Sequence, residues 1–167
     1  GPWSRFESFK FKNASMRRAV AFGLLALPAK SLLLAESLNL GADATQTVGD
    51  AVSLHRDLGD QDPEQLRPSR LVEFLDRFDA AAVTVLAVAS AEDGVRGRLN
   101  EYLDTLRHVR PSLNGNDLLA LGLPQGPLLG EALAALRDAW LDGDVNSPEQ
   151  EIAMARSFVP RAEDGRE

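Results

Sequence analysis

The stretch Asn114–Leu133, NGNDLLALGLPQGPLLGEAL, holds four glycines and two prolines among its leucines. Glycine and proline both end helices, so these twenty residues cannot form one continuous helix. An Asn-Gly turn signal opens the stretch, and Asn116 or Asp117 then predicts the cap of a one-turn helix over 117–121. The first half therefore predicts a turn followed by a short helix.

The second half predicts how that short helix ends and how the next one begins. Gly122 predicts a left-handed terminator, with Leu123 folding back as an apolar cover. Pro127 then opens a longer helix, in which Gly130 suggests a close approach by another backbone. Together the two halves predict a corner between two helices, in which glycine, proline and cap residues mark where each helix begins and ends.

Apolar residues recur at three- and four-residue spacing along most of the chain, and strict alternation is almost absent. The one β-like run, AAAVTVLAVAS over residues 80–90, favours a buried helix because no second strand is available to pair with it. We therefore expect an all-α, irregular multi-helix domain of about eight to nine helices. The predicted helices cover residues 14–27, 29–39, 44–58, 69–77, 80–90, 93–109, 117–121, 127–142 and 148–158.

Cap signals support several of these boundaries. Asp43 with Gln46 three residues later matches a capping box. The run Ser147-Pro148-Glu149-Gln150 combines a serine cap, a proline at the first helical position and a glutamine able to reach back. Gly143 predicts the end of the preceding helix.

Composition describes an ordinary globular chain: 167 residues, 44% hydrophobic and 26% charged, with no cysteine. No apolar run approaches the roughly 20 residues of a membrane span, and the lack of cysteine suits a reducing cytoplasm. We expect one helical domain over 1–167, with a tag remnant at 1–2 and a flexible tail at 161–167. Because the start resembles a cleavage scar, we expect a piece cut from a larger protein.

The net charge of −7 is unevenly spread, with +4 over residues 1–40 and −11 over residues 41–167. This acidic majority argues against broad nucleic-acid binding, so any such contact needs a local patch. Arg96, Asn100 and Arg107 fall within about 40° of one another on a continuous helix. Arg110 would follow at the end of that helix, where a cation suits the dipole. A phosphate contact and a plain solvated face both explain these arginines.

The amides after Gly126 lie at a helix start, where they can receive a phosphate. A well-made corner without a ligand explains the same glycine. The candidate RNA-binding residues are therefore Arg96, Arg107, Arg110 and Gly126.

Three further patterns resemble functional motifs without completing them. The triplet His55-Arg56-Asp57 matches a kinase catalytic loop but lacks its other parts, so we interpret it as the polar end of a helix. Asp142, Asp144 and Asn146 occupy the first, third and fifth positions of an EF-hand calcium loop, but the required glycine, apolar residue and final glutamate of that loop are missing. Asp142 and Asp144 also resemble the paired carboxylates that hold magnesium ions, but they lie on a turn without a sheet to fix them. We predict no catalytic residue and no metal site in this chain.

The run GNDLLALGLPQGPLLGEALAALRDAWLDGDVNSPEQEIAMAR over residues 115–156 carries a family resemblance. It resembles the C-terminal signature of the bacterial tRNA nucleotidyltransferase and poly(A) polymerase family, the CCA-adding enzymes. The resemblance is strong over 99–158 and looser over 28–98, and residues 1–27 show none. The positions that match the signature are Gly115, Asp117, Leu118, Gly122, Gly126, Pro127, Gly130, Asp142 and Gly143.

The family's catalytic head, with its Gly-Ser motif and Asp-x-Asp on a sheet, is not in this sequence, nor is the arginine-rich neck motif. The resemblance therefore implies the helical body and tail, which in that family hold the tRNA while the head adds nucleotides. It implies tRNA and the head of the same polypeptide as partners. It also implies that Mg²⁺ and nucleoside triphosphates belong to the head, and that this chain alone has no cofactor and is not an enzyme.

An alternative function stays open. The acidic charge favours a helical protein-interaction or dimerisation module that keeps the fold and has no RNA contact. Whether the parent protein adds CCA, adds A alone or makes poly(A) depends on the head.

Overall fold

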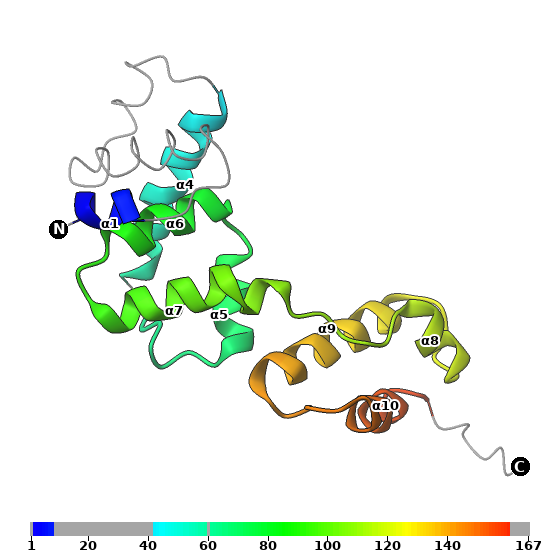
Figure 1. The fold of residues 1–167 in the computed structure, drawn as a ribbon. Helices are drawn as coiled ribbons and strands as arrows, with labels where there is room; N and C mark the ends of the chain where they lie inside the picture. The colour runs from blue at the N-terminus through cyan, green and yellow to red at the C-terminus, as the bar shows by residue number, and fades with distance from the viewer. Residues whose placement is uncertain (1, 9–41, 60, 161–167) are drawn as a thin grey trace, which may run out of the picture. The chain divides into compact units, whose positions relative to one another are not determined.

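The computed structural model describes residues 2–8, 42–59 and 61–160, which contain helices and no strand (Figure 1). The predicted all-α, multi-helix fold is therefore confirmed. None of the described helices has the length and apolar content that a membrane crossing needs. The helices are α1 (Pro2–Ser8), α4 (Ala42–Leu58), α5 (Pro68–Leu75), α6 (Ala80–Ala89), α7 (Asp93–Asp104), the 3₁₀ turn η1 (Leu106–His108), α8 (Gly115–Ala120), α9 (Pro127–Asp142) and α10 (Pro148–Ser157).

The chain divides into two compact units. The first consists of Gly1–Leu66 and Arg70–Arg107, and the second of Arg67–Ser69 and His108–Glu167. Our expectation of one helical domain over 1–167, with a tag remnant at 1–2 and a flexible tail at 161–167, remains a prediction.

Helix α6 is the centre of the first unit. Every residue from Ala81 to Val88 is buried, and the helix packs against α1, α4 and α7 (Figure 1). An all-apolar helix is stable only when other elements cover it on every side. Asp79 caps its start by accepting the Ala81 N–H at 2.7 Å, and Thr84 Oγ1 donates to the Ala80 carbonyl. The prediction of a buried helix instead of a strand is confirmed.

Helix α1 was not predicted from the sequence. Phe6 is buried, and the Trp3 ring meets the Phe6 ring edge-on with 5.7 Å between centroids. Arg5 Nε donates to the Val88 carbonyl at 2.8 Å, at the C-terminal end of α6. A cation there bonds a carbonyl that no helical amide satisfies and also suits the helix dipole.

The second unit is built around α9, which contacts both α8 and α10. Its buried core is small and aliphatic, and partly buried hydrophobic residues pack against it. The buried residues that form its hydrophobic core cluster are Leu118, Leu123, Ala132, Leu136 and Ala155.

The observed helices from 42 onward match the predicted ones to within a few residues, except at the end of α7. The predicted helices 14–27 and 29–39 lie outside the described residues. The predicted capping box at Asp43 is wrong, because Ala42 is already helical and Gln46 Nε2 donates forward to Asp50 Oδ1 at 2.8 Å.

The predicted boundaries of the last two helices are confirmed. Gly143 ends α9 in a left-handed conformation, with φ of 74°. Ser147 caps α10 by accepting the Gln150 N–H, and Pro148 is the first helical residue. Gln150 does reach back, but its Oε1 accepts the N–H of Asn146, one residue before the cap, at 3.0 Å.

Candidate functional site

The corner between α8 and α9 begins with a reciprocal cap. Asn114 Oδ1 accepts the N–H groups of Asn116 and Asp117, while an Asp117 carboxylate oxygen accepts the Asn114 N–H at 2.8 Å. The helix therefore starts at Gly115 and its cap is Asn114, whereas we predicted Asn116 or Asp117. The reason is that Asp117 serves at the third helical position, where it completes the capping box.

Helix α8 ends as predicted. Gly122 has φ of 102°, its N–H bonds to the Leu119 carbonyl, and the Leu123 N–H bonds to the Leu118 carbonyl. This pair of bonds is a Schellman motif, in which the residue after the glycine folds back over the helix. Leu118 and Leu123 are both buried in the core of the second unit.

The start of α9 offers fewer amides than the sequence suggested. Gly126 is its cap with φ of 149°, Pro127 has no N–H, and the Leu129 N–H bonds to the Gly126 carbonyl at 3.1 Å. In the first three helical positions, only the Leu128 N–H is left without a helical partner. The predicted phosphate-binding site after Gly126 therefore offers one backbone amide, that of Leu128, at the positive end of the helix dipole.

The predicted role of Gly130 as a point of close backbone approach is wrong. A β-carbon built at this position would meet no atom within 4 Å. A β-carbon at Gly115, in contrast, would lie 3.6 Å from Leu129 Cδ2. Gly130 therefore leaves part of the exposed face of α9 without a side chain.

The predicted basic stripe assumed a helix that continues to 109, and α7 does not. It ends at Asp104, because Thr105 leaves helical geometry and a 3₁₀ turn follows. Arg96 lies in the first turn of α7, where it pairs with Asp93 and donates to the Ser90 carbonyl at 3.3 Å. Arg107 instead lies over the Tyr102 ring at 5.9 Å.

Arg110 belongs to the second unit and is exposed. Its Nη1 donates to the Val109 carbonyl at 2.8 Å, and Arg137 Nε of α9 donates to the same carbonyl at 3.3 Å. Arg110 and Arg137 therefore meet at one backbone oxygen. Arg137 was not singled out in the sequence, because two residues brought together across a loop leave no local pattern.

The carboxylates that resemble a metal motif have structural partners. Asp142 accepts both the N–H and the hydroxyl of Ser69 at 2.8 Å and pairs with Arg67, which also reaches Asp144 at 3.0 Å. These bonds and ion pairs all lie within the second unit. Among the described residues there is no group of three or more metal-binding side chains.

Glu151 is a buried anchoring residue that the sequence analysis did not identify. It is a fully buried carboxylate on α10 that accepts the N–H of Ser112, the hydroxyl of Ser112 and the N–H of Leu113, the last at 3.0 Å. It therefore fixes the segment that follows Arg110 and precedes the cap at Asn114.

Two opposing effects set the pKa of Glu151. Burial disfavours the charged form and acts to raise the pKa, while hydrogen bonds from Ser112 and Leu113, together with the nearby Trp140 indole N–H, act to lower it. The hydrogen bonds prevail together, and the pKa lies below its ordinary value. The buried Trp140 Nε1 has no partner with hydrogen-bond geometry in the described part of the chain, so its effect on Glu151 is that of a nearby dipole.

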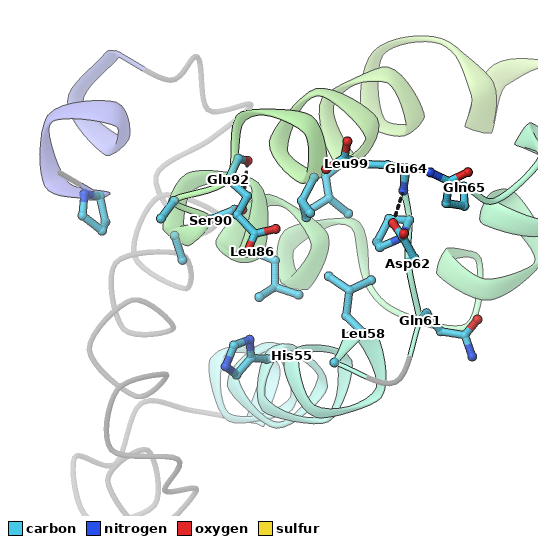
Figure 2. Close-up of a pocket in the computed structure, with 16 residues that line it drawn as sticks. His55, Leu58, Gln61, Asp62, Glu64, Gln65, Leu86, Ser90, Glu92 and Leu99 are labelled. Carbon is cyan, nitrogen blue, oxygen red and sulfur yellow. Dashed lines mark hydrogen bonds between the residues drawn. The ribbon is translucent and has the colours of Figure 1, made fainter.

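A cavity of about 770 Å³ lies in the first unit between α4, α6, α7 and the loop that follows α4 (Figure 2). Its lining combines apolar residues such as Leu58 and Leu86 with the carboxylates of Asp62, Glu64 and Glu92. Three acidic groups in the lining of one cavity repel phosphate, so this cavity does not suit RNA.

The kinase-like triplet lies next to this cavity, in the last turns of α4. His55 lines the cavity (Figure 2). Arg56 pairs with Asp57 at 3.2 Å, and both side chains are exposed. The prediction that the triplet is the polar end of a helix is confirmed.

Most positions of the family signature have a visible structural task. They begin helices, terminate them in positive-φ conformations, fill the core of the second unit or bond to Ser69, whereas Gly115 and Gly130 have no such role. Those with a role are Asp117, Leu118, Gly122, Gly126, Pro127, Asp142 and Gly143.

The sequence is similar to parts of two tRNA nucleotidyltransferases. Over 74 residues, or 44% of the chain, it is 40% identical to the CC-adding tRNA nucleotidyltransferase of Thermus thermophilus. Over 92 residues, or 55% of the chain, it is 27% identical to the A-adding tRNA nucleotidyltransferase of Geobacter sulfurreducens. These stretches cover only 16% and 10% of the two relatives. No protein-family profile and no solved structure matches the chain.

Proposed function

We propose that this chain is a non-catalytic, C-terminal region of a tRNA nucleotidyltransferase-like protein and that it helps to position tRNA. The observation that carries the proposal is the 40% identity over 74 residues to a CC-adding tRNA nucleotidyltransferase. The acidic composition of residues 41–167 restricts the RNA contact to a few local groups.

The second unit supplies two of these groups. Arg110 is exposed, and the segment after it is fixed to the buried Glu151 through Ser112 and Leu113. An arginine on an anchored segment loses little conformational freedom when it meets a phosphate. The Leu128 amide after Gly126 is the second group.

The first unit supplies Arg107, whose guanidinium lies over the Tyr102 ring. Stacking of this kind orients a guanidinium. Arg96 is the weakest of the four candidates, because Asp93 already pairs with it.

Arg107→Ala should weaken tRNA binding about equally for different tRNA sequences and lower the salt slope of the binding constant by about 1, because a phosphate contact reads charge and not bases. The measurement is a tRNA titration at two salt concentrations. The triple variant Arg96→Ala, Arg107→Ala, Arg110→Ala should bind more weakly still. A triple variant that binds as well as wild type at both salt concentrations would show these arginines to be a solvated face.

In this proposal the parent protein is a nucleotidyltransferase that acts in the cytoplasm. Mg²⁺ and nucleoside triphosphates belong to its catalytic head, which is the partner of this region within the same polypeptide. The poly(A) polymerase branch of the family fits the same sequence signature, and the head determines which nucleotides are added.

A second candidate function is a helical protein-interaction or dimerisation module without RNA contact. The net charge of −11 over residues 41–167 favours it, since like charges repel phosphate. Failure of wild type to bind tRNA at low salt would favour this function.

A further inference from the structure

The turn that follows α5 carries an arginine held by aromatic rings. The Arg77 guanidinium carbon lies 4.8 Å from the Phe74 ring centroid and 5.7 Å from that of Phe78. Its Nε donates to the Phe74 carbonyl at 3.2 Å, while the two half-buried rings lie 5.9 Å apart. The turn after the helix, in which the Phe78 N–H bonds to the Leu75 carbonyl at 3.0 Å, brings Arg77 beside both rings.

Arg77 differs from the ion-paired arginines of this acidic chain. In the described part of the chain, its two terminal amino groups have no hydrogen-bond or ion-pair partner, and the side chain is exposed. The ion-paired arginines and their acids are Arg56 with Asp57, Arg67 with Asp142 and Asp144, Arg70 with Glu73, Arg96 with Asp93, and Arg98 with Glu101.

The acids nearest to Arg77 in the sequence are engaged elsewhere. Glu73 pairs with Arg70 at 2.6 Å, Asp76 accepts the Tyr102 hydroxyl at 2.9 Å, and Asp79 caps α6. Arg77 is therefore oriented by stacking and left open to an anion from outside.

We propose that Arg77, held on Phe74 and Phe78, contacts a phosphate of the RNA backbone. This inference rests on the proposed function and adds a contact that the sequence did not indicate. A planar guanidinium presents paired N–H donors that fit phosphate oxygens. Because Nε and the ring contacts already fix its plane, binding costs little additional side-chain entropy. The neighbouring aromatic rings suit the sugar and base beside a phosphate.

The test is a tRNA titration with the whole chain at two salt concentrations, comparing wild type with Arg77→Ala, Arg77→Lys and Arg56→Ala. Arg77→Ala should weaken binding about fivefold near physiological salt and lower the salt slope by about 1. Arg77→Lys should keep the wild-type slope and recover only part of the affinity, because lysine has the charge without the planar fork.

Arg56→Ala is the matched control, since it removes the same charge from an exposed arginine that an aspartate already pairs with. It should bind tRNA within about twofold of wild type. If wild type binds tRNA and Arg77→Ala binds like Arg56→Ala, the inference is overturned while the proposed function stands. If wild type does not bind tRNA, both fall. Thermal melts of the three variants check that each is folded.

Discussion

Glu151→Ala should lower the free energy of unfolding of the second unit by about 3 kcal/mol. The substitution leaves the partly buried N–H groups of Ser112 and Leu113 without their charged acceptor. It also removes the anchor of the segment between Arg110 and α8. Urea unfolding in a Trp3→Phe background measures this, because the fluorescence of Trp140 then reports the second unit alone.

The matched control is Glu131→Ala, which removes an exposed acid from α9 and should change the free energy of unfolding by less than about 0.5 kcal/mol. Equal stabilities of the two variants would contradict the role of Glu151 as a buried anchor.

The same residue gives a pH dependence with a definite sign. The pKa of Glu151 is lowered on folding from its ordinary value of 4.5. Its stabilisation is therefore fully present above about pH 4.5 and is lost as the pH falls through the lower folded value. Glu151→Gln should reduce this loss, because the amide does not titrate. Glu149, whose pKa is lowered by its own backbone N–H and by Ser147, leaves a residual slope in the same pH range.

Gly122→Val should destabilise the second unit by about 1–3 kcal/mol. A φ of 102° is strained for a β-branched residue, and a β-carbon there would lie 3.4 Å from Val159 Cγ1. The substitution would weaken both backbone hydrogen bonds that end α8, those of the Gly122 and Leu123 N–H groups. The packing of Leu123 in the core would weaken with them. Thermal melts of wild type and variant measure the difference.

Gly130→Ala is a control of opposite sign. This glycine is helical, and a β-carbon there meets no atom within 4 Å, so alanine should stabilise α9 by about 0.5–1 kcal/mol. An unchanged melting temperature for Gly122→Val would show that the left-handed conformation at 122 is not needed.

Local signals in the sequence predicted most of the helix boundaries. Gly122 and Gly143 are examples, because a left-handed residue after a helix almost requires glycine. The buried α6 could be predicted because its apolar run has no competing partner strand. The helix cap was predicted at Asn116 or Asp117, because these residues and the nearby Asn114 can each cap a helix. Only the reciprocal hydrogen bond from the Asn114 N–H to Asp117 makes Asn114 the cap.

Contacts between distant residues could not be predicted in the same way. Arg67 with Asp142 and Arg137 with the Val109 carbonyl both join segments that are far apart in sequence. The break of α7 after Asp104 has no glycine or proline to mark it. Glu151 did have a signal, since it lies three and four residues before Met154 and Ala155 on the apolar face of α10. A charged residue on such a face predicts a buried anchor.

The central claim is that this chain holds tRNA without catalysing nucleotide addition. One incubation tests both halves: the whole chain with tRNA, Mg²⁺ and radiolabelled ATP and CTP, followed by filter retention of the tRNA and by measurement of label in it. We predict that tRNA is retained at low salt, that retention falls as salt rises, and that label in the tRNA stays at the level of a buffer control. Label incorporated above that control, or no retention of tRNA at any salt concentration, would contradict the claim.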